Sequence, residues 1–304
     1  QRATGDSNAA AVAASRGLAL LRESATGGNS DPELRYLTLG ALATLGAYEV
    51  AANQISQGTI HMRESAEGMD QLVAEFPENT LYQRQQMLSW SHVADVLSGE
   101  GQTEEAVHAL EHSVAIARKM FAADQADARA GSDLGIALTY LAEVLPEAQY
   151  ARKQAVLAEA IQMLRNATQR NPKNVQGKSF LAEATFHLGD AFSAGNDKKR
   201  AVSSWFEGMA MADKLTGTRS VTLVDAYTSA CRRLGQDAGE RGDRKVAEGY
   251  AKKVQDFGGL KGQNPKANVP RVLAAQGSIY YALARSSAAT GDDSKRATEL
   301  LHQS

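Results

Sequence analysis

Pairs of a large apolar residue followed by a small residue recur along the chain at intervals of 46 to 49 residues. A further, mostly apolar position lies three residues before each large one. Positions three or four apart share one face of a helix, so the pattern predicts six amphipathic first helices. The pairs are Leu45-Gly46, Val93-Ala94, Leu141-Ala142, Leu188-Gly189, Leu234-Gly235 and Leu283-Ala284, and the preceding positions are Leu42, Trp90, Leu138, Thr185, Cys231 and Tyr280.

A second helix is expected to follow each first helix. It starts twelve or thirteen residues after the small residue, at Gly58, Ala106, Gln154, Ala201, Ala247 and Ala297. Turn residues separate the two helices, as in Gly99-Glu100-Gly101 and Gly242-Asp243. Gly, Asn and Asp tolerate the left-handed conformation that ends a helix. The six prolines are expected at helix ends and not inside helices, because proline lacks the amide hydrogen that a helix interior needs.

Two helices per repeat, six times over, predict an all-α fold, a solenoid of about six helix pairs with a 46–49-residue period. Residues 1–8 are expected to form a flexible N-terminal segment, and residues 9–304 a single repeat domain. Residues 9–26 are predicted to be the second helix of an incomplete preceding repeat. The six repeats cover approximately residues 31–79, 80–127, 128–174, 175–220, 221–268 and 269–304.

Charge and composition exclude several classes of partner. The formal net charge of −2 provides no basic excess to neutralise phosphates, so binding of nucleic acid is not expected. No apolar stretch approaches the roughly 20 residues that span a bilayer, so this chain is not expected to contact a membrane. A single cysteine, Cys231, says little about the compartment. The chain lacks an initiator Met, and we expect it to be a piece of a longer protein.

The repeats resemble the tetratricopeptide repeat, whose first helix carries Trp, Leu-Gly and Tyr and whose second helix carries Ala and an aromatic residue. The fourth and second repeats match best, with Leu188-Gly189, Phe192, Ala201 and Trp205 in the fourth and Trp90, Val93-Ala94, Leu97, Ala106 and Leu110 in the second. The first repeat departs from the pattern, with Glu49 at the Tyr position and Gly58 at the Ala position. The resemblance implies a right-handed α-α superhelix that binds a protein or peptide, although the period exceeds the family's 34 residues.

A narrower resemblance covers about residues 30–145. The runs Leu81-Tyr82-Gln83-Arg84, Val93-Ala94-Asp95-Val96-Leu97 and Ala115-Ile116-Ala117-Arg118 are similar to the repeat region that follows the catalytic domain in some bacterial serine/threonine protein kinases. This resemblance implies a non-catalytic interaction or sensor domain in signal transduction, with the kinase domain outside this chain. It also implies an extracytoplasmic position, and a cytoplasmic one stays open. The alternative is a free-standing scaffold for assembling a complex.

Several short motifs suggest chemistry. His108-Ala109-Leu110-Glu111-His112 spells a zinc-peptidase pattern and makes a zinc hydrolase a further alternative. Leu110 occupies a core position, which turns both histidines toward solvent, so no catalytic residue, metal site or cofactor is expected. Cys231 is expected to be a small buried residue. Trp90 and Trp205 are predicted to be packing anchors, because aromatic rings bury a large area.

A partner is expected on the concave face that the first helices line. The residues that face it are expected one position after the small residue of each pair and one position after the residue that precedes each pair by three. We call these reference positions the core landmarks. These candidates are Ser91, Asp95, Thr139, Glu143, Phe186, Asp190, Arg232, Gln236, Tyr281 and Arg285. The middle of this surface is acidic and its C-terminal end is basic, which favours an extended partner of mixed charge whose acidic groups pair with Arg232 and Arg285. The alternative is a solvated face that binds nothing.

Overall fold

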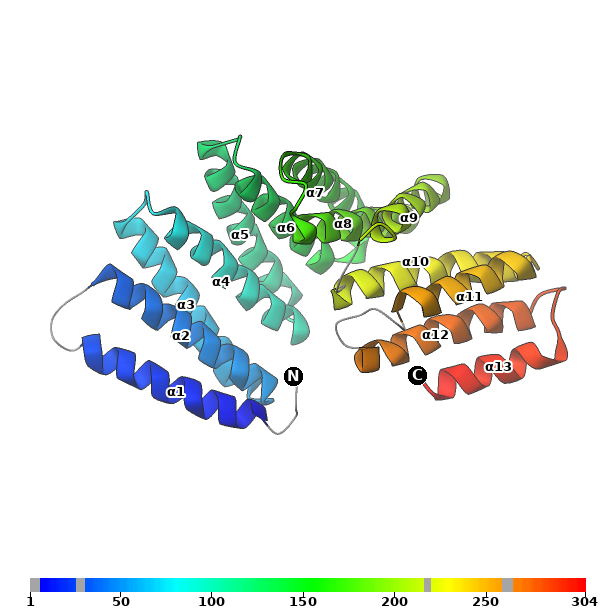
Figure 1. Ribbon diagram of the computed structural model, residues 1–304, viewed down its shortest axis with the longest axis horizontal. Helices are drawn as coiled ribbons and strands as arrows, with labels where there is room; N and C mark the ends of the chain where they lie inside the picture. Colours follow the sequence, from blue (N-terminus) through cyan, green and yellow to red (C-terminus); the bar gives the residue numbers. More distant parts are fainter. Residues whose placement is uncertain (1–5, 26–30, 216–219, 259–264) are drawn as a thin grey trace. The chain divides into compact units, whose positions relative to one another are not determined.

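The computed structural model describes residues 6–25, 31–215, 220–258 and 265–304 of the chain. These residues form thirteen α-helices, one short 3-10 helix and no strand (Figure 1). The predicted fold class, an all-α helical-repeat solenoid, is confirmed. The helices are α1 (Asp6–Ala25), α2 (Pro32–Ala51), α3 (Ile55–Glu75), α4 (Thr80–Gly99), α5 (Thr103–Ala123), α6 (Ala128–Val144), η1 (Glu147–Gln149), α7 (Tyr150–Arg170), α8 (Val175–Ala194), α9 (Lys198–Ala212), α10 (Val221–Glu240), α11 (Arg244–Gly258), α12 (Pro265–Ala284) and α13 (Gly291–His302).

The chain folds as two compact units, Gln1–Pro146 and Glu147–Ser304, called unit 1 and unit 2. Unit 1 contains α1 to α6, and unit 2 contains η1 and α7 to α13. The boundary falls inside the third predicted repeat, after its first helix. The single domain over residues 9–304 and the six repeat limits stay predictions.

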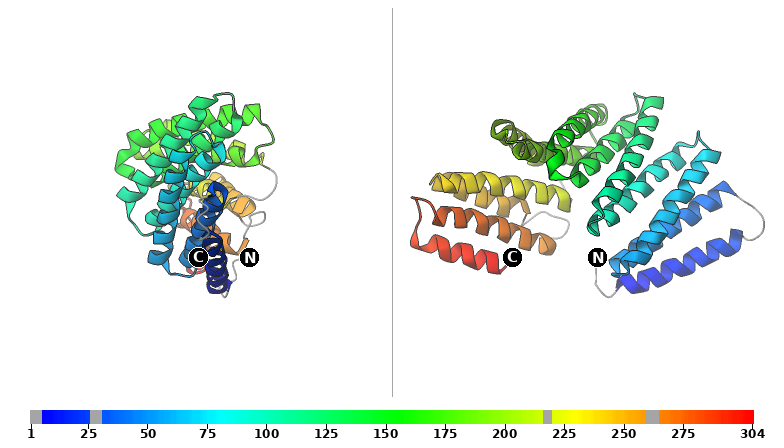
Figure 2. Two further views of the ribbon diagram at one scale, coloured as in Figure 1. Left: turned by 90° about the vertical axis from the view of Figure 1, so that its left-hand side faces the viewer. Right: turned by 180° about the vertical axis from the view of Figure 1, so that it is seen from behind.

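In unit 1, helices that are consecutive in the sequence pack against each other from α1 to α6. Leu42 and Leu45 of α2 are buried with Ala11 and Leu18 of α1, so α1 covers the first complete hairpin. This matches the expected second helix of an incomplete repeat. Figure 2 shows the successive helices of the unit from two further sides.

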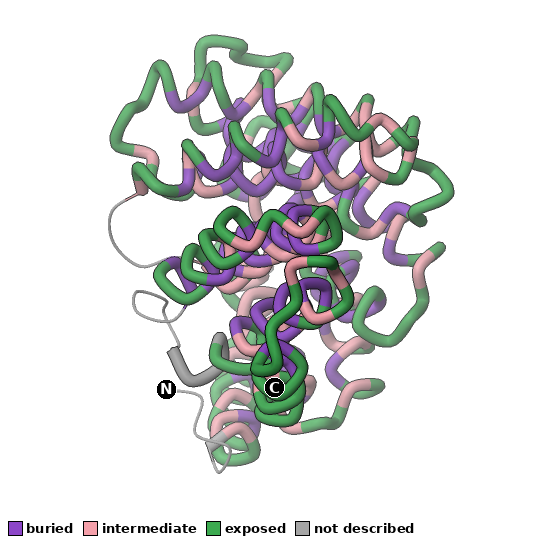
Figure 3. The backbone as a smooth tube through the Cα atoms, turned by 90° about the vertical axis from the view of Figure 1, so that its right-hand side faces the viewer, coloured by how far each residue is buried: buried purple, intermediate pink, exposed green. Residues whose placement is uncertain are grey.

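Unit 2 is built on the same plan, with hairpins α8/α9, α10/α11 and α12/α13. Its first helices α8, α10 and α12 also contact one another in that order. An aromatic stack fills the centre of the unit, where the rings of Tyr227 and Phe257 lie 3.6 Å apart and Phe186 meets Tyr227 edge-on. Figure 3 shows the buried positions on the helix sides that face other helices, which is the amphipathic pattern that the sequence predicts.

The turns follow the predicted chemistry. Gly101 and Gly242 have positive φ angles of 76° and 77°, in the left-handed region that glycine occupies without strain. Asn196 takes the same conformation at 61°. Asn79 and Asp197 cap the helices that follow them, because each side chain accepts a hydrogen bond from a backbone amide of the first turn. Local sequence therefore fixes where these helices begin and end.

The observed helices differ from the predictions in three respects. The second helices begin earlier than expected, from three residues at α3 to six at α13, because their first turns are polar and lie outside the apolar pattern. The first helix begins at Asp6, so residues 6–8 are helical and not part of a flexible segment, while residues 1–5 lie outside the described residues. Pro270 lies inside α12, near its N-terminal end, where a missing amide hydrogen removes one intrahelical bond.

No helix in the described part of the chain is long and apolar enough to cross a membrane.

Candidate functional site

Two of the ten predicted partner-contacting residues are buried. Thr139 is fully buried, and its hydroxyl donates to the carbonyl of Gly135 one turn earlier. Phe186 is 1% exposed and belongs to the aromatic core of unit 2. The prediction that these two side chains line an open surface is wrong, because a position one residue past the core stripe is still covered by a neighbouring helix.

Two further candidates face the second helix of their own hairpin. Ser91 of α4 lies 2.9 Å from the hydroxyl of Ser113 on α5. Asp190 of α8 accepts a hydrogen bond from the indole nitrogen of Trp205 on α9 at 3.1 Å and lies 3.4 Å from Arg233 of α10. These polar side chains join helices within their unit.

The other six candidates have exposed or half-buried side chains. Asp95 and Glu143 are exposed in unit 1. In unit 2, Arg232 donates to Gln236 at 3.2 Å, and burial lowers the pKa of this arginine. These residues stay candidates for partner contact.

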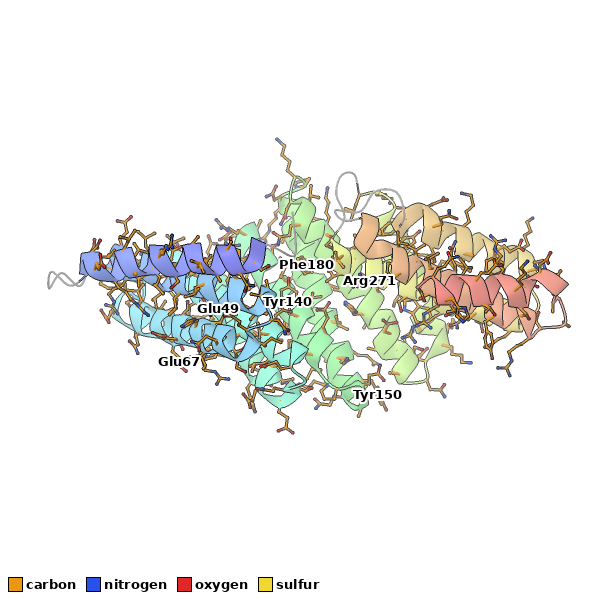
Figure 4. All side chains as sticks on the ribbon, turned by 90° about the horizontal axis from the view of Figure 1, so that it is seen from below. Glu49, Glu67, Tyr140, Tyr150, Phe180 and Arg271 are labelled. Atoms are coloured by element: carbon orange, nitrogen blue, oxygen red, sulfur yellow. The ribbon has the colours of Figure 1, made fainter. Side chains whose placement is uncertain are left out.

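At the C-terminal end of α12, the guanidinium of Arg285, one residue after the helix, lies 5.6 Å from the centre of the exposed Tyr281 ring. Near the start of the same helix, Arg271, which Figure 4 labels, pairs with Asp225 of α10. Burial raises the pKa of Asp225. The first-helix surface of unit 2 therefore combines an inter-helix ion pair with an exposed tyrosine–arginine pair.

A hollow of unit 1 lies on another side, where α3 and α5 flank α4. It has a volume of about 400 Å³, and we call it hollow 1. Val93, Leu97 and Ala109 give it an apolar floor. Trp90 also lines it and is only half-buried, so its role as a packing anchor stays a prediction, whereas Trp205 is buried as predicted.

A carboxylate of α3 organises the polar side of hollow 1. Asp70 accepts hydrogen bonds from the amide of Gln86 at 2.7 Å and from the indole nitrogen of Trp90 at 3.0 Å. His112 of α5 lies 3.5 Å from the same carboxylate and meets the Trp90 ring edge-on, with 5.0 Å between ring centres. Asp70 thus fixes the orientation of the indole ring.

The rim of hollow 1 carries charged residues of both second helices. Arg63 of α3 pairs with Glu105 of α5 at 3.2 Å. His108 lies 3.5 Å from Glu111, and its side chain is 79% exposed, as predicted for a histidine turned away from the core. Both histidines nevertheless line hollow 1 and do not simply face bulk solvent.

A comparable hollow of about 350 Å³ lies in unit 2 between α9 and α11, and we call it hollow 2. Phe206, Met209 and Ala210 line it from α9, and Val246, Gly249 and Tyr250 from α11. Asp213 and Lys253 lie at 4.0 Å from each other on its border. None of these eight residues stands out in the sequence pattern.

Sequence reasoning also missed Asp70, because a lone polar residue on a second helix looks like ordinary solvent-facing surface. The signal that could have identified the hollow was the pair of histidines one helical turn apart, next to the tryptophan position of the same repeat. As a sequence motif, that pair spells a zinc-peptidase pattern and is expected to face solvent without binding a metal. Its geometry in the structure is that of an aromatic ring held by a carboxylate and flanked by ion pairs.

The single cysteine occupies a structural position. Cys231 is fully buried in the core of unit 2, as predicted, and burial raises the pKa of its thiol to about 12, far from the range of a nucleophile. Within the described part of the chain, no group of three or more His, Cys, Asp or Glu side chains is placed to hold a metal ion.

No protein-family model matches the chain, and no curated protein matches it either. Solved structures do match. The crystal structure of BtubC (BKLC) from P. vanneervenii is 15% identical, with 83% of this chain and 90% of that chain covered and a TM-score of 0.61. The apo form of RapI is 12% identical, with 95% and 68% covered and a TM-score of 0.59.

The nearly identical TPR-like repeats of a putative kinesin light chain from Podosopora anserina also match, with 18% identity, 75% and 97% covered and a TM-score of 0.42. At such low identities, the likeness to BtubC and RapI shows a shared all-helical fold and nothing about a ligand.

Proposed function

We propose that this chain is a non-catalytic protein-binding module, and that hollow 1 receives a side chain of an extended partner segment. The observation that carries this proposal is the half-buried Trp90 over an apolar floor, with charged pairs at the rim. Tryptophan and arginine are the residues most enriched among those that dominate binding energy at protein interfaces. A volume of about 400 Å³ in an open hollow suits part of a polypeptide.

The hydrogen bonds around Trp90 support a binding role because they hold the ring in place before a partner arrives. Its indole nitrogen donates to Asp70, and Gln86 holds the same carboxylate from the other side. A ring that is already ordered loses little conformational entropy on binding. The rim pair Arg63–Glu105 is exposed, so it adds little stability and is available to select a partner by charge.

The wider role that we propose is the sensor region of a bacterial serine/threonine protein kinase. The resemblance of residues 30–145 to the repeat regions of such kinases supports this role, and the alternative is a free-standing scaffold. The gene sequence that encodes residues before Gln1 tests the two. A kinase domain followed by a membrane span supports the sensor, and an unrelated or absent domain supports the scaffold.

Filling hollow 1 tests the binding site. His108→Trp places a large ring at an exposed rim position and is expected to weaken binding of short synthetic peptides by about tenfold or more, as blocking an interface hot spot does. Ile60→Trp is the matched control, because Ile60 occupies the same register on α3 and is 58% exposed. Fluorescence anisotropy of labelled peptides measures both affinities.

The first-helix surface is tested in the same assay with Arg285→Glu. Unchanged binding by His108→Trp together with lost binding by Arg285→Glu would assign the partner to the first helices and reject hollow 1. No binding of any peptide by the parent chain would reject the proposed function itself.

A further inference from the structure

The two units repeat one another at a nearly constant offset in the sequence. Helices α1 to α6 of unit 1 correspond in order to α7 to α12 of unit 2. The ion pair Arg22–Glu64 joins α1 to α3, and Arg165–Glu207 joins α7 to α9, with both residues 143 positions later. The units are therefore equivalent in the register of their side chains as well as in their helices.

Hollow 1 and hollow 2 occupy the same place in their units, between the second helices of the first two complete hairpins. Asp70 and Asp213 are 143 positions apart and border the two hollows, Asp70 from α3 and Asp213 from the C-cap of α9. His112 and Lys253 are 141 positions apart and face these aspartates from α5 and α11. Each hollow thus pairs an aspartate on one second helix with a basic residue on the next.

The aspartate is held by the first helix in both units. Asp70 accepts a hydrogen bond from Gln86 of α4, and Asp213 accepts one from the hydroxyl of Tyr227 of α10 at 3.0 Å. These two donors are also 141 positions apart. The same three-part arrangement of donor, aspartate and base therefore borders each hollow, although the donor and the base differ chemically.

The opposite rim differs between the hollows. Arg63 and Glu105 form an ion pair across hollow 1. The residues at the same register in hollow 2 are Phe206 and Val246, which are 50% and 41% exposed. Hollow 2 therefore offers more apolar contact, while its basic residue has nearly the same side-chain exposure as that of hollow 1, 49% against 46%.

We infer that the chain has two docking sites for one class of partner segment, in which a large apolar side chain is followed by a carboxylate. The apolar lining receives the apolar side chain, and the basic residue at the border, about half exposed, is accessible to the carboxylate. This inference rests on the proposed function and extends it to unit 2. A partner with two such segments in tandem gains affinity because the second contact is intramolecular.

The probes are short peptides with one Phe and one Asp joined by glycine spacers of increasing length, and a matched series with Lys in place of Asp. Isothermal titration of the full chain is expected to show two peptides bound per chain, and the Lys series is expected to bind at least about tenfold more weakly. Lys253→Glu and His112→Glu are each expected to remove one binding event. A peptide with Lys is expected to regain binding to the Lys253→Glu variant, which a merely misfolded unit 2 would not allow.

The inference is overturned if the parent binds one peptide per chain and Lys253→Glu leaves that event unchanged. In that case hollow 1 alone binds, and the proposed function stands. It is also overturned if hollow 2 binds a second copy of the chain, which light scattering would show as a dimer that Phe206→Asp dissociates. Failure of every peptide in both series to bind would reject the proposed function together with the inference.

Discussion

Unit 1 and unit 2 use the same order of helices but fill the equivalent close contact differently. In unit 1, Gly46 of α2 meets Gly58 of α3 so closely that a Cβ atom on Gly46 would lie 2.7 Å from the Gly58 carbonyl oxygen. In unit 2, Gly189 packs against the ring of Trp205, and Ala201 takes the place of Gly58. Both units bring a second-helix carbonyl and a side chain against this glycine, but the side chain is that of Met62 in unit 1 and the ring of Trp205 in unit 2. The repeat therefore constrains the filled volume more than the residue types.

The units also share a device for buried charge. Unit 1 buries Asp133 of α6 against Arg84 of α4, with an N–O distance of 2.6 Å and an 8% exposed aspartate side chain. Unit 2 buries Asp293 of α13 against Arg244 of α11, with a 4% exposed aspartate side chain. The first pair joins two first helices and the second joins two second helices. Both units therefore contain a buried Arg–Asp pair, but the helices that it joins differ. Removing the arginine tests how much such a pair stabilises its unit.

The largest effect is expected from Arg244→Met, which removes the ion pair of the buried Asp293 carboxylate and leaves the Thr290 amide as its donor. A buried carboxylate that loses its charged partner is destabilising, so α13 should open from unit 2 more readily than in the parent. Hydrogen exchange of the α13 amides measures this local loss. Arg241→Met is the control, because Arg241 pairs with the exposed Asp237. Equal exchange in both variants would contradict a special role for the buried pair.

Acid should weaken the same contact by a smaller amount. The hydrogen bond from Arg244 lowers the pKa of Asp293 to about 2, below its ordinary value. The stabilisation that the ionised Asp293 gives to the folded unit is therefore fully present above pH about 4. It is lost as the pH falls toward 2, because the carboxylate becomes protonated. Melting of the parent and of Asp293→Asn across this range, followed by circular dichroism, tests it. The difference between the two proteins should shrink as the pH falls, and a constant difference would contradict the assignment.

The next largest effect is expected from Gly46→Ala, which should destabilise unit 1 and leave unit 2 unchanged. The added methyl group would overlap backbone atoms of α3, which costs about 1–2 kcal/mol. Gly40→Ala on the same helix meets no atom within 4 Å and should be stabilising by up to about 1 kcal/mol. Trp90 reports on unit 1 and Trp205 on unit 2, so denaturation of single-tryptophan variants assigns the loss to unit 1. A loss confined to unit 2 would contradict the close contact.

The smallest effect is expected at the equivalent ion pairs Arg22–Glu64 and Arg165–Glu207. All four side chains are about half exposed, so Arg22→Ala and Arg165→Ala should each cost less than about 1 kcal/mol. High salt screens exposed charges, so it should remove the difference in unfolding free energy between each variant and the parent. A large, salt-insensitive loss at one site only would show that the equivalence of the two units stops at the helices.

Local sequence is enough to predict the helices, their pairing into repeats and their turns. These features depend on local periodicity and on residues such as Gly101 and Gly242, whose conformations are set within a few positions of the chain. It also placed Trp205 and Cys231 in the core, because both occupy the middle of an apolar stripe. Helical periodicity is sufficient wherever the burial of a residue depends on a single face of its own helix.

The accessibility of the polar faces, in contrast, depends on how the helices pack and does not follow from local sequence. A first helix contacts its own second helix and the neighbouring repeats, so a residue 100° from the apolar stripe is still covered, as at Thr139 and Phe186. Conversely, Trp90 stands at a core landmark but lines a hollow, because the second helices on either side do not close over it. Exposure at these positions depends on the spacing between neighbouring helices, which residues far apart in the sequence set together.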